Sequence, residues 1–146
     1  MSRALKCRAL LLRCIDYRLE RPGHAYLERR GLGDACDVLS VAGSVRTLTS
    51  SSDEGGRDFV LGQIALSMKL HSPEEIVLMN HTDCGAYGGT TAFPSEEAET
   101  RAHLRDLAAA RGLILSLHPG VAVRLLLARV ASSGRVRLRE VAPTGT

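Results

Sequence analysis

Two short motifs in this chain gather the side chains that could do chemistry. The first, with the sequence CIDYR, occupies residues 14–18, and the second, HTDCG, occupies residues 81–85. Each follows an apolar run of the kind that forms a buried strand. Two thiolates and an imidazole suit zinc, and three protein ligands leave a fourth position for water or substrate, as in catalytic zinc sites. We therefore predict a Zn²⁺ site formed by Cys14, His81 and Cys84.

Asp16 and Arg18 stand beside the first cysteine and are not needed as ligands once three are in place. A guanidinium next to a carboxylate keeps it ionised and forms strong charge-assisted hydrogen bonds with it. We expect the two residues to form a catalytic dyad that handles a proton. The alternative is an ordinary surface salt bridge, which contributes little.

The remaining cysteines and histidines lack such neighbours in the sequence. Cys7 and Cys36 are isolated, and each is predicted to be a small buried apolar side chain. An oxyanion-cradling cysteine enzyme would need an arginine six positions after its cysteine, but Glu20 and Thr90 stand there. Iron–sulfur binding is disfavoured because no four thiolates occur at cluster spacing. The other histidines are predicted to be ordinary surface or core residues: His24, His71, His103 and His118.

The composition is that of an ordinary globular domain. The chain has 146 residues, of which 45% are apolar and 24% charged, so it is long enough for one core and too short for two. We predict a single domain over residues 1–146. The net charge of +3 is spread along the chain, which argues against a nucleic-acid partner. The alternating segment 135–139, RVRLR, is interpreted as a strand with an exposed basic face.

We expect no targeting signal at the N-terminus. The short apolar run is interrupted at Arg13 and no small-residue cleavage site follows. No stretch approaches the roughly 20 apolar residues of a membrane span. We therefore predict a cytoplasmic protein with free thiols and no membrane partner.

Strand-like and helix-like segments alternate along the chain, which predicts an α/β fold with a mostly parallel central sheet of about four to five strands flanked by helices. Residues 45–56 are polar and are expected to form a loop that could move over a site. The expected strands are 8–14, 37–41, 76–79 and one within 121–127, and the expected helices are 22–30, 59–70 and 95–111.

The predicted strand ends explain how the motifs could meet. In a parallel α/β sheet, ligands bind beyond the carboxyl ends of the strands. Cys14 ends the first expected strand, the turn at 42–44 follows the second, and His81 follows the third. The helix over 59–70 is apolar on several sides and needs a second burial surface, which a partner subunit would supply. We expect a homodimer or a higher homo-oligomer.

The two motifs resemble those of the β-class carbonic anhydrases, Cys-x-Asp-x-Arg after the first strand and His-x-x-Cys-Gly after the third. The resemblance extends over roughly residues 10–89. It implies zinc held by Cys14, His81 and Cys84, a dyad of Asp16 and Arg18, and reversible hydration of carbon dioxide to bicarbonate by a zinc-bound hydroxide. Asp16 either supports that hydroxide or coordinates zinc in a closed form.

Several residues depart from the family pattern. Tyr17 stands where serine is usual, Ser44 replaces a common asparagine after Ala-Gly, and residues 40–41, SV, replace Arg-Asn. The chain has no tryptophan, so we expect the bicarbonate-binding regulatory pocket of certain members to be absent. We do not expect the N-terminal helical arm that is usual in the family, so a dimer would form through a smaller surface. Related zinc hydrolases of carbonyl sulfide or carbon disulfide use the same ligands, so they remain alternatives, as does a noncatalytic zinc-binding homologue. Three aromatic residues either line the pocket or simply pack: Tyr17, Tyr87 and Phe93.

Overall fold

A five-stranded sheet runs through the centre of the computed structural model, which describes residues 5–143. The strand order is β2-β1-β3-β4-β5; the first four strands are parallel and β5 is antiparallel to β4. The strands are β1 (Ala9–Arg13), β2 (Cys36–Ser40), β3 (Glu75–His81), β4 (Ala122–Val130) and β5 (Val136–Val141). This confirms the predicted α/β fold with a mostly parallel sheet.

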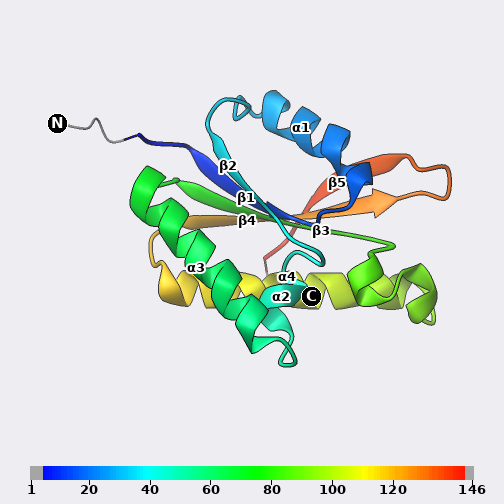
Figure 1. Ribbon diagram of the computed structural model, residues 1–146. Helices are drawn as coiled ribbons and strands as arrows, with labels where there is room; N and C mark the ends of the chain where they lie inside the picture. Colours follow the sequence, from blue (N-terminus) through cyan, green and yellow to red (C-terminus); the bar gives the residue numbers. More distant parts are fainter. Residues whose placement is uncertain (1–4, 144–146) are drawn as a thin grey trace.

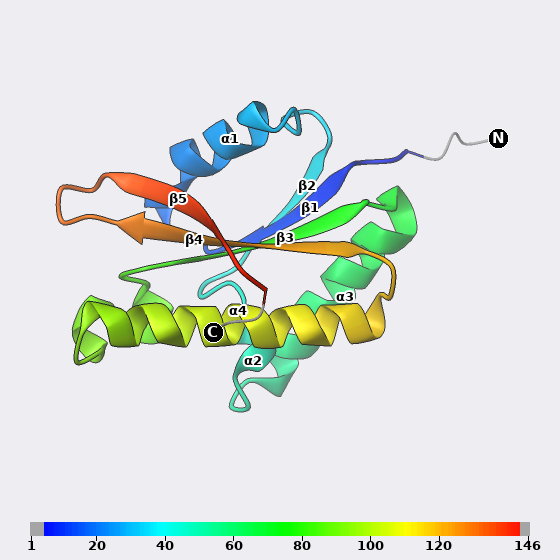
Figure 2. The same ribbon diagram turned by 180° about the vertical axis from the view of Figure 1, so that it is seen from behind.

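Helices cover both faces of the sheet (Figure 1). One face carries α1 (Glu20–Arg29), and the opposite face carries α2 (Arg46–Thr49), α3 (Glu54–His71) and α4 (Glu96–Leu117). The view from behind shows the same three layers, with the β4–β5 hairpin extending beyond them (Figure 2). Three short 3-10 turns complete the chain, at Tyr17–Leu19, Gly85–Tyr87 and Thr90–Ala92. None of the helices in the described part of the chain combines the length and apolarity needed to cross a membrane.

The continuous apolar runs of the strands are explained by burial on both faces. Along β1, Leu10 and Leu12 enter the core beneath α3 and α4, whereas Leu11 enters the core beneath α1. Successive side chains of a strand point to opposite faces, so each run of leucines serves two cores. The same alternation holds along β3, where Ile76 and Leu78 share one core and Val77 and Met79 share the other.

The expectation of a polar loop over 45–56 was wrong for most of this segment, and only the turn at 50–53 between two helices agrees with it. Residues 46–49 form α2, and Val45 and Leu48 are buried in the core beneath α3 and α4. Helix α3 also begins five residues before the predicted start, with the Asp53 carboxylate accepting a hydrogen bond from the Gly56 amide at 2.8 Å. Burial of Val45 and Leu48 and the Asp53 cap stabilise helices in a segment whose serines and threonines predicted a loop.

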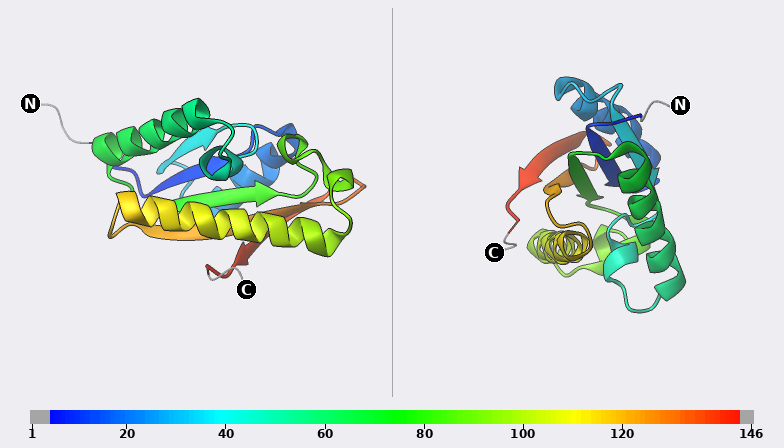
Figure 3. Two further views of the ribbon diagram at one scale, coloured as in Figure 1. Left: turned by 90° about the horizontal axis from the view of Figure 1, so that it is seen from below. Right: turned by 90° about the vertical axis from the view of Figure 1, so that its left-hand side faces the viewer.

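The predicted end of the last helix at 111 was also wrong, because α4 continues through Gly112 to Leu117. A mid-helix glycine costs about 1 kcal/mol relative to alanine. Full burial of Ile114 outweighs that cost, since burying such a side chain contributes about 1.5–3 kcal/mol. The start was predicted correctly: Ser95 Oγ accepts a hydrogen bond from the Ala98 amide at 3.1 Å. Figure 3 shows α3 and α4 on the same face of the sheet.

The basic segment near the C-terminus forms the edge strand β5, as predicted. Arg137 and Arg139 are exposed, while Val136 and Leu138 pack against the core beneath α1. This strand is paired only to β4, where Arg129 stands opposite Arg137 in the register.

Candidate metal centre

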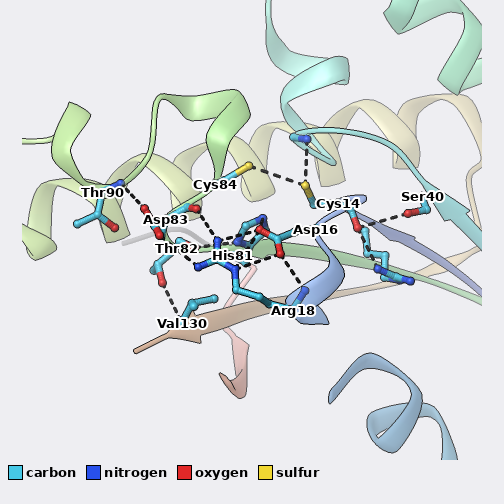
Figure 4. Close-up of polar contacts among 12 residues, drawn as sticks. Cys14, Asp16, Arg18, Ser40, His81, Thr82, Asp83, Cys84, Thr90 and Val130 are labelled. Carbon is cyan, nitrogen blue, oxygen red and sulfur yellow. Dashed lines mark hydrogen bonds and ion pairs between the residues drawn. The ribbon is translucent and has the colours of Figure 1, made fainter. Parts of the chain in front are cut away.

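The carboxyl ends of β1 and β3 bring the two motifs together. These strands pair in parallel with Leu12 opposite Leu78, so Cys14, just beyond β1, lies next to His81 at the end of β3. Cys84 follows His81 after a turn in which Asp83 adopts a positive φ of 55°. All three predicted ligands are buried, at 5% exposure for Cys14, 1% for His81 and 2% for Cys84. Figure 4 shows their side chains facing one another.

The geometry of the three side chains fits a metal ion. The two sulfur atoms are 3.9 Å apart, and one ligand atom from each residue lies within 4.8 Å of the others. His81 Nδ1 lies 2.7 Å from the Thr82 carbonyl oxygen, to which it donates, leaving Nε2 with its lone pair free. Nε2 is buried and has no hydrogen-bond partner among the described residues. A buried nitrogen of this kind is costly unless something binds it, and a metal ion would do so.

The two thiols are electrostatically coupled. Hydrogen bonding from Cys84 lowers the pKa of Cys14 to well below its ordinary value despite burial, and the Gly43 amide, 3.4 Å from the Cys14 sulfur, adds to this effect. The same contact with Cys14 raises the pKa of Cys84, and burial raises it further. The pair therefore loses one proton readily and keeps the second until a cation offsets the added charge.

His81 is electrostatically suited to a position beside a thiolate. Burial lowers its pKa, but the neighbouring Cys14 sulfur and the Thr82 carbonyl outweigh burial, and the net pKa lies above the ordinary value. The turn after β2 also reaches this end of the sheet. Its residue Gly43 contacts the Cys14 sulfur through its backbone amide.

Asp16 and Arg18 form a bidentate ion pair beside the three ligand residues. Arg18 Nε donates to Asp16 Oδ1 at 3.1 Å, and Nη2 donates to Oδ2 at 2.8 Å. The bonds from Arg18 lower the pKa of Asp16 against the effect of burial. Asp16 Oδ2 is 3.8 Å from His81 Nε2, but Asp16 is not part of the compact ligand group. In this structure the carboxylate is held by Arg18.

Arg18 is held in place by residues that were not predicted from the sequence. Arg18 Nη1 lies 3.2 Å from Asp83 Oδ2, and Nη2 donates to the Asp83 carbonyl at 3.0 Å. Asp83 is itself held by the amide of Thr90, which donates to Oδ1 at 3.0 Å, and by Glu99 Oε2, which accepts from the Asp83 amide at 2.8 Å. Asp83 lies inside the second motif and could have been suspected. Glu99 could not, because an acidic residue in a first helical turn is usually exposed, whereas Glu99 is only 2% exposed.

A second polar network lies behind the site, and it places His103 in the core. Asn80 Nδ2 donates to Tyr87 Oη at 2.9 Å and lies 3.0 Å from His103 Nδ1, while Tyr87 Oη donates to Asp106 at 2.8 Å. Burial lowers the pKa of His103 to about 4, so it is neutral at pH 7. His103 is therefore a core residue, one of the two alternatives predicted from the sequence.

The three aromatic residues considered as pocket lining fall into two groups. The rings of Tyr87 and Phe93 lie 4.5 Å and 6.3 Å from His103, which is packing behind the site. Tyr17, between the dyad residues, is 85% exposed. Its side chain therefore lies at the surface and does not pack in the core.

An open pocket of about 530 Å³ adjoins the second motif. It lies between the start of α4 and the β4–β5 hairpin, and Thr82, Asp83 and Glu99 form its inner wall. Neither cysteine nor His81 lines it, so this hollow is a neighbour of the ligand group and not the space in front of it.

Comparison with known proteins identifies similar chains. Residues 4–133 match the family described as "Putative carbonic anhydrase". An uncharacterized protein of Rickettsia conorii, RC0076, is 30% identical over 121 residues, and the match covers 81% of this chain and 65% of that protein. An uncharacterized protein of Rickettsia bellii is 29% identical over 121 residues, covering 81% and 74%. The matched segment thus spans slightly less than two-thirds of the Rickettsia conorii protein.

Two solved structures show the same fold at low sequence identity. A β-carbonic anhydrase from the ascomycete Sordaria macrospora, described as tetrameric, superposes with a TM-score of 0.62 at 15% identity, covering 94% of this chain and 84% of that one. β-Carbonic anhydrase isoform I from Trichomonas vaginalis gives 0.59 at 16% identity, covering 94% and 86%. The resemblance drawn from the two motifs is thereby confirmed at the level of family and fold. Because the family match covers most of its length, the chain belongs to the family described as "Putative carbonic anhydrase".

Proposed function

We propose that this protein is a zinc-dependent lyase that hydrates carbon dioxide reversibly to bicarbonate. The observation that carries the proposal is the position of the dyad: an ionised carboxylate, clamped by Arg18, lies 3.8 Å from the unpartnered nitrogen of His81. Cys14, His81 and Cys84 would hold the zinc ion. Zinc in such a site supplies a Lewis acid that brings the pKa of water down to about 7, which makes hydroxide available at neutral pH.

The residues of the chain divide the remaining work. Asp16 is kept ionised by Arg18 and accepts a hydrogen bond from the reacting water, which orients the lone pair of that water toward carbon dioxide. Arg18 cannot easily swing away, because Asp83 binds its other edge through both a carboxylate oxygen and the backbone carbonyl. The Thr82 carbonyl fixes the tautomer of His81, so that Nε2 faces the two sulfur atoms.

The dyad also favours catalysis over a purely structural zinc site. Structural sites are closed by four protein ligands. Among the described residues the group has three members, Cys14, His81 and Cys84. The Asp16 carboxylate beside them is bound by Arg18. A noncatalytic homologue would not need that arrangement, since a partly exposed ion pair contributes little stability.

We also infer a homo-oligomer in the cytoplasm. Helix α3 exposes Phe59, Leu66 and Leu70, and the edge strand β2 beside it exposes Val38. A second copy of the chain would bury this apolar surface. The four cysteines are free, as a reducing compartment requires.

Replacement of Cys84 tests the proposal. In Cys84→Ser we expect loss of zinc from this site and carbon dioxide hydration at the uncatalysed rate, because the remaining sulfur and nitrogen cannot hold the ion. Cys36→Ser is the matched control, since Cys36 lies at the start of β2 and outside the ligand group. Zinc quantification and stopped-flow hydration would be run on both, with carbonyl sulfide and carbon disulfide assayed in parallel. A Cys84→Ser protein that hydrates carbon dioxide as fast as the control would contradict the proposal.

A further inference from the structure

A second group of side chains that could bind a metal lies at the opposite end of the strands from Cys14, His81 and Cys84. Cys7, Asp37 and His71 each offer a ligand atom, and these atoms all lie within 4.8 Å of one another. Cys7 precedes β1, Asp37 is the second residue of β2, and His71 ends α3. The group therefore sits at the amino ends of the strands, whereas Cys14, His81 and Cys84 sit at the carboxyl ends.

Backbone pairing fixes the three contributing segments relative to one another. The Cys7 amide donates to the His71 carbonyl at 2.9 Å, and the Arg8 amide donates to the Ala35 carbonyl at 2.7 Å. Leu10 is in register with Asp37 across the β1–β2 pair. Figure 1 shows the end of α3 beside the start of β1. Residues far apart in the sequence are thus brought together by backbone hydrogen bonds that tie the segment before β1 to the end of α3 and to the start of β2.

The side chains already have an ordered arrangement. Asp37 Oδ2 accepts a hydrogen bond from Ser67 Oγ at 2.6 Å and lies 2.8 Å from His71 Nδ1. Burial raises the pKa of Asp37, but the contacts with Ser67 and His71 outweigh it, so Asp37 remains ionised. Burial raises the pKa of the Cys7 thiol, and the charge of Asp37 also acts in that direction. The group consequently holds one fixed negative charge and a thiol that a cation would deprotonate.

The group can be reached from solvent. Its three residues are half-buried and line a shallow hollow of about 330 Å³, whose rim includes Lys6, Asp34 and Cys36. A hydrated ion could enter here without any rearrangement of the core. Three protein ligands would leave a position for water, as at an exchangeable site and unlike a closed structural one.

We propose that Cys7, Asp37 and His71 form a second metal site, which binds a divalent ion of borderline character such as zinc. A thiolate, an imidazole and a carboxylate are all ligands that zinc accepts, whereas magnesium and calcium prefer sets made of oxygen atoms only. The ion would tie the segment before β1 to the edge strand and to the end of α3. Because these contacts exist only in the folded chain, binding would raise thermal stability.

Zinc stoichiometry of the whole protein tests this inference. Equilibrium dialysis of the wild type should give two equivalents of zinc per chain, and Cys7→Ser should give one, with the Kd of the second equivalent raised at least about tenfold. Cys36→Ser is the matched control and should keep two, because Cys36 lies beside Asp37 in the sequence but is not a member of the group. His71→Ala is a second variant, which does not change the segment before β1. It should also bind one equivalent of zinc.

Cobalt(II) in the Cys14→Ser, Cys84→Ser double variant separates the two sites. With the first site removed, one equivalent of cobalt should still bind and show thiolate-to-metal charge-transfer absorption, and the added Cys7→Ser replacement should abolish that absorption. A Cys14→Ser, Cys84→Ser protein that binds no cobalt would overturn the inference, and so would an equivalent that survives when Cys7→Ser or His71→Ala is added to that double variant. The test is independent of carbon dioxide hydration, so each proposal can fail alone.

Discussion

Asp16 Oδ2 lies 3.8 Å from His81 Nε2, although Asp16 follows β1 and His81 is the last residue of β3. The nitrogen is buried without a hydrogen-bond partner among the described residues, and the carboxylate is turned toward Arg18. The ionised Asp16 carboxylate can therefore accept a hydrogen bond beside the predicted ligands Cys14, His81 and Cys84. This relationship is the geometric basis of the proposed reaction.

Replacing Arg18 should change the pH dependence of hydration. The bonds from Arg18 lower the pKa of Asp16, so in Arg18→Gln that pKa moves up and Asp16 takes up a proton at a higher pH. The acid limb of the rate profile should therefore move to higher pH, with a lower maximum rate. Stopped-flow measurement of the pH profile checks this, with Arg21→Gln, an exposed position on α1, as control.

Stability should change in the same variant with a definite sign. A carboxyl group whose pKa is depressed by folding contributes stability above its unfolded pKa, and this contribution is lost as the pH falls through the folded pKa. Arg18→Gln should thus have a smaller free energy of unfolding than the wild type at neutral pH, and the difference should shrink in acid. An unchanged acid limb together with unchanged unfolding would show that Arg18 does not act on Asp16.

Glu99 should act as a positioning residue for the second motif. It accepts from the Asp83 amide, between His81 and Cys84, and also from Thr90 Oγ1 at 3.1 Å. In Glu99→Gln the Asp83 amide no longer has a charged carboxylate as its acceptor. The free energy of unfolding should therefore fall by about 1–3 kcal/mol. The hydration rate should fall roughly tenfold, since outer-shell contacts orient metal ligands.

Glu96→Gln is the control for Glu99, because Glu96 is exposed in the same turn of α4. Denaturant unfolding, zinc content and stopped-flow hydration would be measured for both variants. Full activity of Glu99→Gln at an unchanged zinc content would rule out a positioning role.

The exposed apolar surface of α3 should mediate self-association. Leu66→Glu places a charge on this surface, and burying an unpaired charge is strongly unfavourable, so the oligomer should dissociate. Leu117→Glu, at an exposed position on α4, should leave the assembly intact. Light scattering coupled to size-exclusion chromatography gives both masses. A wild type that elutes as a monomer, or a Leu66→Glu protein with the wild-type mass, would contradict the proposed interface.

The sheet and the convergence of the motifs could be predicted because both depend on simple periodic rules. Unbroken apolar runs predict parallel strands covered on both faces, and the carboxyl ends of such strands share one edge. Cys14 and His81 therefore had to be neighbours once β1 and β3 were paired. The roles of these residues as ligands, and of Asp16 and Arg18 as a dyad, remain predictions.

Features that depend on tertiary packing could not be predicted. Val45 and Leu48 are single apolar residues in a polar segment, yet both are buried, and Gly112 suggested an end to α4 that the burial of Ile114 overrides. Glu99 and the group of Cys7, Asp37 and His71 became visible only from the fold, since no spacing along the chain links their members. Burial explains Val45, Leu48, Ile114 and Glu99, whereas chain topology brings Cys7, Asp37 and His71 together.

Stopped-flow hydration of carbon dioxide by zinc-quantified wild type and Asp16→Ala tests the central claim most directly. We predict that the wild type accelerates hydration and that Asp16→Ala is slower by at least about 100-fold with its zinc retained, as expected for loss of a proton-handling group. Asp58→Ala, which removes an exposed carboxylate on α3, should hydrate at the wild-type rate. Zinc-loaded wild type that shows no hydration above background, or Asp16→Ala with unreduced activity, would contradict the account.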